Sequence, residues 1–333
     1  MKRKKSSPSL NRALTLTLPA TSANLGPAFD AAALAFDLNF KIAATPARDF
    51  SIQARGRDTA ICGELENNLI IATYEDLLRA HGREVSPLAF KIQNEMPIGK
   101  GCGSSAAARL AGIAFAVHFG SLPWGDAEII AEASRLEHHP DNAAACWLGG
   151  VAVARMSEAM KSGAEMSRDS APTTSVQSVK ITPKGKWPLL LVVPEQKLAT
   201  EKARAVLPAN YSRADTVANI QNSMLLLAAF TEGRRDLLVG AFDDRIHQPY
   251  RAPLCPLLPA LQSLAGEKGI LGVALSGAGP SVLMFLDAKV PAGKIRTTVS
   301  NYLKRRGLSA ELLSTKIAMK GTVRSRTWRF PKS

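Results

Sequence analysis

The chain has 333 residues, of which 46% are hydrophobic and 21% charged, so it is too apolar for a disordered chain and long enough for two packed domains. Most of its net charge of +14 lies at the two ends: residues 1–12 carry five basic side chains, residues 316–333 carry six, and neither segment has an acid. The body of the protein is therefore nearly neutral and gives little support for a nucleic-acid partner. Four cysteines without a C-x-x-C pair argue against a disulfide framework and a cysteine-rich zinc site. The sequence also lacks an eighteen-residue apolar run and a secretory signal, so we expect no membrane span and a cytoplasmic protein.

The first half of the chain has the pattern of a mixed α and β domain. Alternating or continuous apolar runs predict strands at residues 14–18, 35–44, 88–93 and 151–156. The breakers in 19–30 predict that the chain leaves the sheet there. Apolar residues with a 3.6-residue period predict helices at residues 67–81, 104–119 and 125–137.

A polar, aperiodic segment at 157–178 separates this half from a second α and β unit. Downstream, strands are predicted at 187–194, on both sides of a glycine turn within 272–286, and at 310–319. Helices are predicted at 212–230, 233–242, 257–266 and 291–306. We therefore expect an N-terminal domain over residues 11–178, a C-terminal domain over 179–319, and basic, mobile tails at 1–10 and 320–333.

The loop at residues 97–105, P-I-G-K-G-C-G-S-S, lies between a predicted strand and a predicted helix. Its alternating glycines let the backbone approach a bulky anion, and the helix N-terminus offers unpaired N–H groups and the positive end of a dipole. The two serines could cap the helix, or give hydroxyls to a phosphate or its magnesium ion. The dinucleotide fingerprint and the Walker loop do not match, so the alternatives are a phosphate loop of another kind and a plain glycine-rich turn.

Three ordered motifs are similar to those of the GHMP small-molecule kinases. They are P-x-x-x-G-x-G-S-S-A-A from residue 97, PATSANLGPAFD at 19–30 and LSGAGPSV at 275–282. Within that superfamily, N-L-G-P followed by F-D, and the H-P-D-N at 139–142, resemble the homoserine kinases. The resemblance implies an α+β, two-domain GHMP kinase fold, with an N-terminal ribosomal S5 domain 2-like fold and a C-terminal ferredoxin-like α/β sandwich. It also implies ATP and Mg²⁺ as cofactors, a site between the domains, and glycines at 277 and 279 that pack near the phosphate loop.

The resemblance extends to individual residues of the nucleotide site. It implies that ATP is bound by the loop residues Pro97, Gly99, Lys100, Gly101, Cys102, Gly103, Ser104 and Ser105. It gives the metal to Ser105 and Glu137, with Glu132 as a rival on the same predicted helix. Cys102 departs from the usual leucine and is interpreted as a small packed hydrophobe, while Ala28 replaces a usual glycine and could tighten the substrate side.

An amino-acid substrate needs charges of both signs in its pocket. Asp30 and Asp141 can face an ammonium group, and Arg204 and Arg251 can hold a carboxylate with two hydrogen bonds each. Arg245 and His247 leave the identity of the second arginine open. The resemblance completes this pocket with Asn24, His139, Thr200 and Gly277.

The implied reaction is ATP-dependent phosphorylation of the side-chain hydroxyl of L-homoserine to O-phospho-L-homoserine, in threonine biosynthesis. Asn142 and Arg204 are the predicted catalytic residues, with Asn142 orienting the hydroxyl and the γ-phosphate accepting its proton. The alternatives are the same kinase fold acting on another small alcohol and, in a different class, a nucleic-acid-binding module. We expect no nucleic-acid or membrane partner, and the resemblance allows a homodimer.

Overall fold

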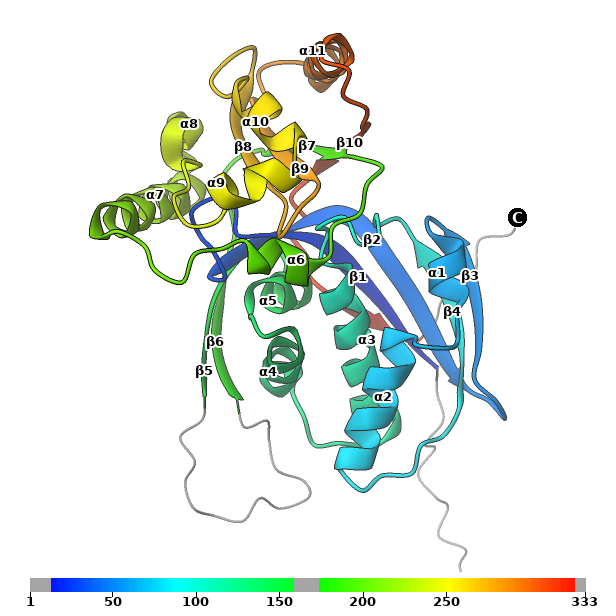
Figure 1. Cartoon of the computed structure of the whole chain (residues 1–333). Coiled ribbons are helices and arrows are strands. Elements are labelled where there is room, and N and C mark those ends of the chain that lie inside the picture. The colour runs from blue at the N-terminus through cyan, green and yellow to red at the C-terminus, as the bar shows by residue number, and fades with distance from the viewer. Residues whose placement is uncertain (1–12, 159–173, 327–333) are drawn as a thin grey trace, which may run out of the picture.

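A computed structural model describes residues 13–158 and 174–326, which form two sheets and their covering helices (Figure 1). The strands are β1 Leu14–Ala23, β2 Ala32–Pro46, β3 Ser51–Gly56, β4 Leu88–Asn94, β5 Val151–Glu158, β6 Thr174–Ile181, β7 Pro188–Val193, β8 Ile270–Leu275, β9 Val282–Leu286, β10 Glu311–Lys316 and β11 Val323–Ser325. The helices are α1 Thr59–Gly63, α2 Leu69–Ala80, α3 Ser104–Phe119, α4 Asp126–Glu137, α5 Asp141–Leu148, α6 Thr200–Ala205, α7 Arg213–Glu232, α8 Leu238–Ala241, α9 Gln248–Arg251, α10 Leu257–Gln262 and α11 Ala292–Arg305.

The first sheet has the order β11-β1-β2-β4-β3, and β5 and β6 continue it from β2. Helices α2 to α5 cover one of its faces (Figure 1). Helix α2 begins where the side chain of Asn68 accepts hydrogen bonds from the amides of Ile70 and Ile71. It packs closely on α3 because Gly112 has no side chain: a Cβ there would lie 2.6 Å from the carbonyl oxygen of Ile70. The helices predicted at 67–81, 104–119 and 125–137 are thereby confirmed.

Strand β1 is longer than its sequence pattern predicts. The strand predicted at 14–18 is too short, because β1 pairs with β2 as far as Ala23, and the chain then leaves the sheet within 19–30, as predicted. A register shift between Pro19 and Ala20 accommodates the proline, which has no N–H for the ladder. The irregular loop therefore starts only at Asn24, next to the end of β1 in the interior of the molecule.

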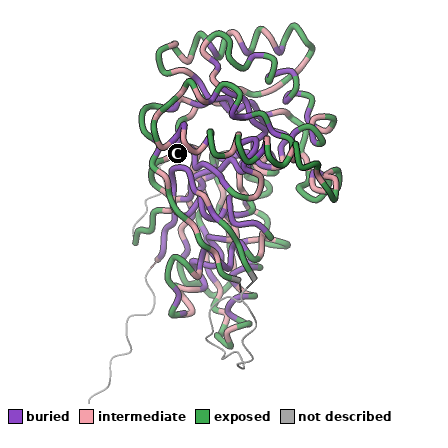
Figure 2. The backbone as a smooth tube through the Cα atoms, turned by 90° about the vertical axis from the view of Figure 1, so that its left-hand side faces the viewer, coloured by how far each residue is buried: buried purple, intermediate pink, exposed green. Residues whose placement is uncertain are grey.

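The second sheet has the order β10-β7-β9-β8, with all neighbours antiparallel. This is the β-α-β-β-α-β arrangement of a ferredoxin-like sandwich, as the resemblance implied. Alternate residues of β7 face two cores: Leu190 and Val192 pack under α10 and α11, while Leu189 and Leu191 join the core that continues into the first domain. The two domains therefore share buried apolar surface, and Figure 2 shows buried residues concentrated inside and exposed ones on the outer elements.

Three predictions about the second half need correction. The boundary at residue 178 falls inside β6, which pairs with β5 along its whole length. The helix predicted at 233–242 is interrupted, because Gly240 has φ 93° and Val239 a non-helical ψ of 110°. The tail predicted from residue 320 is ordered as far as β11, which pairs with β1. The tail segments 1–10 and 327–333 lie outside the described residues.

Within the described ranges, no helix combines the length and the apolar character that crossing a membrane requires.

Candidate active site

The loop at 97–103 is shaped by its glycines. Gly99, Gly101 and Gly103 have φ of 69°, 76° and 70°, a region that side-chain-bearing residues rarely adopt. Gly103 is the N-cap of α3, and no side chain caps this helix. The prediction that serines cap it is therefore wrong, and the N–H groups of its first turn have no side-chain partner. Such a turn after a glycine-rich loop is a binding site for a phosphate.

The second domain supports this loop directly. Ser276 Oγ donates a hydrogen bond of 2.7 Å to the carbonyl oxygen of Gly101. A Cβ on Gly101 would lie 2.1 Å from the carbonyl oxygen of Ser276 and 2.9 Å from that of Gly279. The expectation that the 277–279 glycines pack near the phosphate loop is confirmed, and it places the loop where the two domains meet.

Cys102 and Lys100 turn their side chains away from the anion side of the loop. Cys102 is buried, and its burial raises the pKa of the thiol to about 12, so it is a packed hydrophobe as predicted. Lys100 Nζ donates to the carbonyl oxygens of Pro194, Glu195 and Gln196. The ammonium group of Lys100 therefore fastens the loop to the second domain, and only the backbone of this residue is left for the ATP contact that was predicted.

A cavity of about 310 Å³ opens beside Gly99, Ser104 and Ser105. Most of its wall is apolar, and its lining includes Phe40, Ile61, Leu69, Ile92, Met96 and Ile98. A flat aromatic base attached to a phosphate on the loop could enter it. The cavity could not be predicted from the sequence, because its lining combines residues of β2, α1, α2 and β4 with the glycine loop and the start of α3.

Ser105 and Glu137 meet across the first turn of α3. Ser105 Oγ donates a 2.7 Å hydrogen bond to Glu137 Oε2, and Arg109 Nε donates one of 2.6 Å to Oε1. The rival Glu132 is held by both guanidinium donors of Arg135 on its own helix. A hydroxyl and a carboxylate beside a phosphate site are oxygen donors of the kind that Mg²⁺ prefers, so the residues at 105 and 137 fit this ion.

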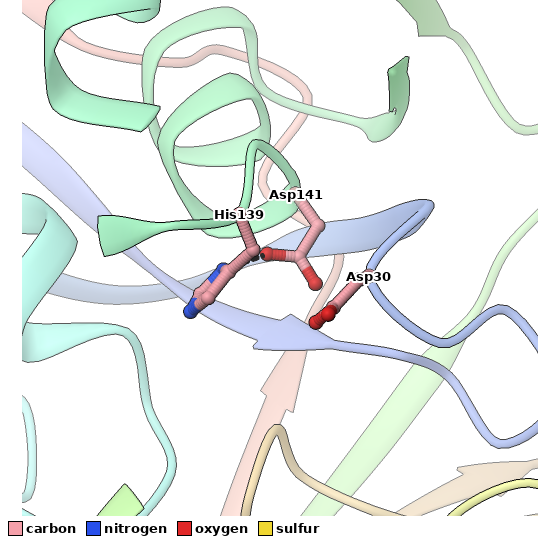
Figure 3. A group of neighbouring side chains, drawn as sticks. All are labelled: Asp30, His139 and Asp141. Carbon is pink, nitrogen blue, oxygen red and sulfur yellow. Dashed lines mark hydrogen bonds and ion pairs between the residues drawn. The ribbon is translucent and has the colours of Figure 1, made fainter. Parts of the chain in front are cut away.

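A buried acidic cluster lies deeper in the site (Figure 3). Asp30, His139 and Asp141 have ligand atoms within 4.8 Å of one another, and the two carboxylates point toward each other. Asp141 Oδ1 contacts His139 Nδ1 at 2.6 Å and accepts from the amide of Asn142 at 2.7 Å. Its other oxygen, Oδ2, is buried without a partner. Because an unpaired buried carboxylate oxygen is costly, this atom marks a place for a cationic ligand.

The same cluster sets the protonation of His139. Burial alone would lower the pKa of this imidazole, but the hydrogen bond to Asp141 and the charges of Asp141, Asp30 and Glu137 outweigh it and raise the pKa. His139 is therefore a tightly held part of the acidic cluster, and a positive charge on it offsets part of the negative charge there.

Two arginines lie close to the Phe29 ring. The guanidinium carbons of Arg204 and Arg251 are 5.4 Å and 5.3 Å from its centroid. Arg204 makes two hydrogen bonds, of 3.0 Å and 2.7 Å, to the carboxylate of Asp30. The predicted carboxylate-binding arginine thus holds a carboxylate of the protein itself in this structure. Phe29 was not predicted, although it lies inside the first motif.

Arg251 is buried and is the second arginine of the site. Its Nε donates to the carbonyl oxygen of Ala203 at 2.9 Å, and its NH1 faces His247 Nδ1 at 3.1 Å. His247 Nε2 lies 2.8 Å from the carbonyl oxygen of Gly26 and donates to it, so Nδ1 is the acceptor for the arginine. The alternative Arg245 pairs with Asp243 at the surface. His247 therefore orients Arg251 rather than replacing it.

Asn24 and Asn142 lie on the two sides of the same space. Asn24 Nδ2 donates to the carbonyl oxygen of Gly277, and its Oδ1 accepts from the amide of Asp30. The hydroxyl of Thr21 donates a 2.7 Å hydrogen bond to Asn142 Oδ1, which leaves the Nδ2 group of Asn142 to face other partners. Thr200 is exposed at the start of α6, away from these contacts.

An uncapped helix after a glycine loop, an adjoining apolar cavity and side chains with charges of both signs fit a two-domain kinase for small molecules. The sequence comparisons identify its class: the GHMP kinases N terminal domain matches residues 68–150, and the GHMP kinases C terminal domain matches residues 226–305. The chain therefore has the GHMP kinase fold that its motifs predicted.

Relatives over the whole length identify the family more closely. The chain is 39% identical to a homoserine kinase of Solibacter usitatus, over 92% of this chain and 95% of that protein, and 36% identical to one of Deinococcus radiodurans, over 94% and 97%. A solved homoserine kinase structure from Cytophaga hutchinsonii shares the fold at 21% identity, with a TM-score of 0.75 over 97% of this chain and all of that one. The chain belongs to the homoserine kinase family.

Proposed function

We propose that this protein transfers the γ-phosphoryl group of ATP to the side-chain hydroxyl of L-homoserine, giving O-phospho-L-homoserine on the route to threonine. The observation that carries the proposal is the buried Oδ2 of Asp141, which has no partner among the described residues and lies beside Asp30, the carboxylate that Arg204 holds. An acceptor with an ammonium and a carboxylate on one carbon matches these charges. A neutral sugar or alcohol would leave Asp141 Oδ2 without a partner.

The ammonium group of the acceptor binds between the carboxylates of Asp30 and Asp141. Its carboxylate binds Arg251 and, after exchange with Asp30, Arg204. The free-energy cost of this exchange is small, because the guanidinium of Arg204 is paired with a carboxylate before and after it. The substrate ammonium replaces Arg204 as the partner of Asp30. Asn24 and Gly277 form the wall between these groups, and His139 keeps Asp141 in place.

ATP binds with its base in the apolar cavity and its phosphates on the amides that follow Gly101 and Gly103. Ser105 and Glu137 would hold the magnesium ion, and Arg109 orients the Glu137 carboxylate from its other oxygen. When bound, Mg²⁺ neutralises charge on the phosphates and so lowers the barrier to transfer. The hydrogen bond between Ser105 and Glu137 supports this assignment, because their oxygens Oγ and Oε2 lie only 2.7 Å apart and could contact the same ion.

Asn142 orients the acceptor hydroxyl. Because Thr21 occupies Oδ1 of this residue, its Nδ2 group donates to the hydroxyl oxygen and turns a lone pair toward the γ-phosphate. Asn142 is not a base, so the hydroxyl proton passes to an oxygen of the transferred phosphoryl group, as a loose transition state allows. The loop amides and Arg204 stabilise the charge that develops during transfer.

The test compares L-homoserine with two analogues that each lack one charge. A coupled ADP-release assay should give turnover with L-homoserine, while 3-amino-1-propanol, without the carboxylate, and 4-hydroxybutanoate, without the ammonium, should each lose on the order of a thousandfold in kcat/KM. Mevalonate, shikimate and galactose serve as the other small alcohols. Equal activity with either truncated analogue, or higher activity with another alcohol, would contradict the proposal. A cytoplasmic location for the reaction stays a prediction.

A further inference from the structure

The connection between β7 and α6, residues 194–199, comes from the second domain but lies on the phosphate loop of the first (Figure 1). Lys100 Nζ donates hydrogen bonds to the backbone carbonyl oxygens of Pro194, Glu195 and Gln196. These bonds fix the connection against the loop. They also use all three N–H donors of the ammonium group, so the lysine within the loop has no donor left for a phosphate.

Lys197 follows directly after these carbonyl groups, and its side chain lies over Gly99. A Cβ on Gly99 would be 3.6 Å from Cδ and 3.9 Å from Cγ of Lys197, so the aliphatic stem is in ordinary contact range of the loop. Gly99 also lines the apolar cavity, together with Ser104 and Ser105. The ammonium group of Lys197, just beyond Cδ, is therefore held near the place where the cavity and the phosphate loop meet.

This ammonium group has no partner of opposite charge within the described part of the chain. Across residues 13–158 and 174–326, Lys197 makes neither a hydrogen bond nor an ion pair with its side chain, and the residue is exposed. Burial and the positive charge of Lys197 lower the pKa of Lys100, while the charges of Asp58 and Glu195 oppose the shift. Two neighbouring ammonium groups repel each other, and an anion bound beside them would offset that repulsion.

We propose that Lys197 is a binding residue for ATP, whose ammonium group donates to the phosphates nearest the base. The inference rests on the proposed function, since it takes the ligand to be ATP with its base in the apolar cavity. Gly99 lies at the cavity end of the loop, whereas Gly103 lies beside Asn142, at the end where the acceptor binds. The phosphate contact expected of the lysine in the loop thus falls to a lysine of the second domain.

The experiment is calorimetry of the full chain with ATP, ADP and adenosine, in the presence of Mg²⁺ and without an acceptor. Lys197→Met keeps the aliphatic stem but removes the charge, so it should weaken ATP and ADP binding by about tenfold each and leave adenosine binding unchanged. Lys197→Arg should stay within about threefold of the unmodified protein, because the positive charge remains. Lys186→Met, at an exposed lysine before β7, is the matched control and should bind all three ligands normally.

Ionic strength separates a charge contact from a structural role. The difference between the unmodified protein and Lys197→Met should shrink as potassium chloride is added, because exposed charges are screened by salt. Unchanged ATP affinity in Lys197→Met, an equal loss for adenosine, an equal loss in Lys197→Arg, or a difference that salt does not reduce would each overturn the inference.

The same measurements distinguish this inference from the proposed function. If the unmodified protein binds ATP and phosphorylates L-homoserine while Lys197→Met binds ATP normally, only the role of Lys197 is wrong. If the expected pattern of affinities is found but another alcohol is the better acceptor, only the proposed acceptor is wrong. A chain that binds no ATP at all would overturn both.

Discussion

Acid should destabilise this protein through His247, whose imidazole must stay neutral. The ring is completely buried, accepts from Arg251 at Nδ1 and donates to the carbonyl oxygen of Gly26 at Nε2, so a second ring proton would point at a guanidinium. Burial and the charge of Arg251 lower the pKa of His247 to about 4, although Asp244, 3.4 Å away, opposes the shift. The structure therefore keeps His247 unprotonated through the physiological range.

The size of the effect follows from the unfolded chain, where a histidine has a pKa of about 6.5. Between pH 6.5 and 4 the unfolded chain binds a proton that the folded protein does not bind, so the free energy of unfolding falls as the pH falls. A pKa difference of about 2.5 corresponds to a loss of about 3 kcal/mol over this interval. His139 acts in a different interval, because its raised pKa gives stability that is present below about pH 6.5 and is lost as the pH rises through its folded pKa.

The assay is urea unfolding of the unmodified protein and of His247→Gln at several pH values from 7.5 to 4.5. The glutamine variant should be less stable at pH 7.5, since its amide replaces only part of the two hydrogen bonds, but the difference should shrink by about 2 to 3 kcal/mol toward the lowest pH. His118→Gln, at an exposed position of α3, is the control and should follow the unmodified protein. A difference between the unmodified protein and His247→Gln that is independent of pH would refute the reasoning.

Three further outcomes are expected. Asn142→Ala should lower kcat by about a hundredfold with little change in the KM for ATP, and steady-state kinetics with a normal kcat would exclude its role at the acceptor hydroxyl. Gly103→Ala should weaken ATP binding in calorimetry far more than Gly99→Ala: both have positive φ, but a Cβ at 103 would lie 1.9 Å from Thr21 Oγ1, whereas the nearest atom at 99 is 3.6 Å away. Equal effects would count against the loop geometry. Deleting residues 320–333 should lower the melting temperature by several degrees, because it removes β11, whereas deleting 327–333 should not; equal melting temperatures would contradict a structural role for this strand.

The phosphate loop could be predicted from the sequence because it depends on short-range chemistry, whereas Ser105 and Glu137 were placed together only by the resemblance to the GHMP kinases, with Glu132 as a rival. Glycines that allow positive φ and a helix that starts after them are local signals. The fold class followed from the order of strands and helices, and from three motifs in fixed sequence order. The ends of elements were less predictable: Pro19 looked like the end of a strand, but neighbouring strands hold it inside one.

What the sequence could not provide are contacts that only the tertiary structure creates. Lys100 Nζ donates hydrogen bonds to three backbone carbonyl oxygens that lie nearly a hundred positions away in the sequence, and no local sequence pattern predicts these contacts. The orientation of Arg251 by His247 likewise depends on the Gly26 carbonyl, more than two hundred residues away in sequence. A lysine in a glycine loop suggests a phosphate ligand, and an arginine on a short helix suggests a surface charge. In both cases burial and the backbone of another element decide the role.

The short strand at the extreme end of the described chain has a consequence for biosynthesis. Since β11 completes the edge of the sheet at β1, and the second domain is translated between these two strands, that edge of the nascent first domain stays unpaired until residues 323–325 have left the ribosome. An open edge is a place where two growing chains can adhere to each other. The protein therefore finishes its first domain last, and a premature stop near residue 320 would release a molecule whose catalytic loops are all present but whose oldest strand is still uncovered.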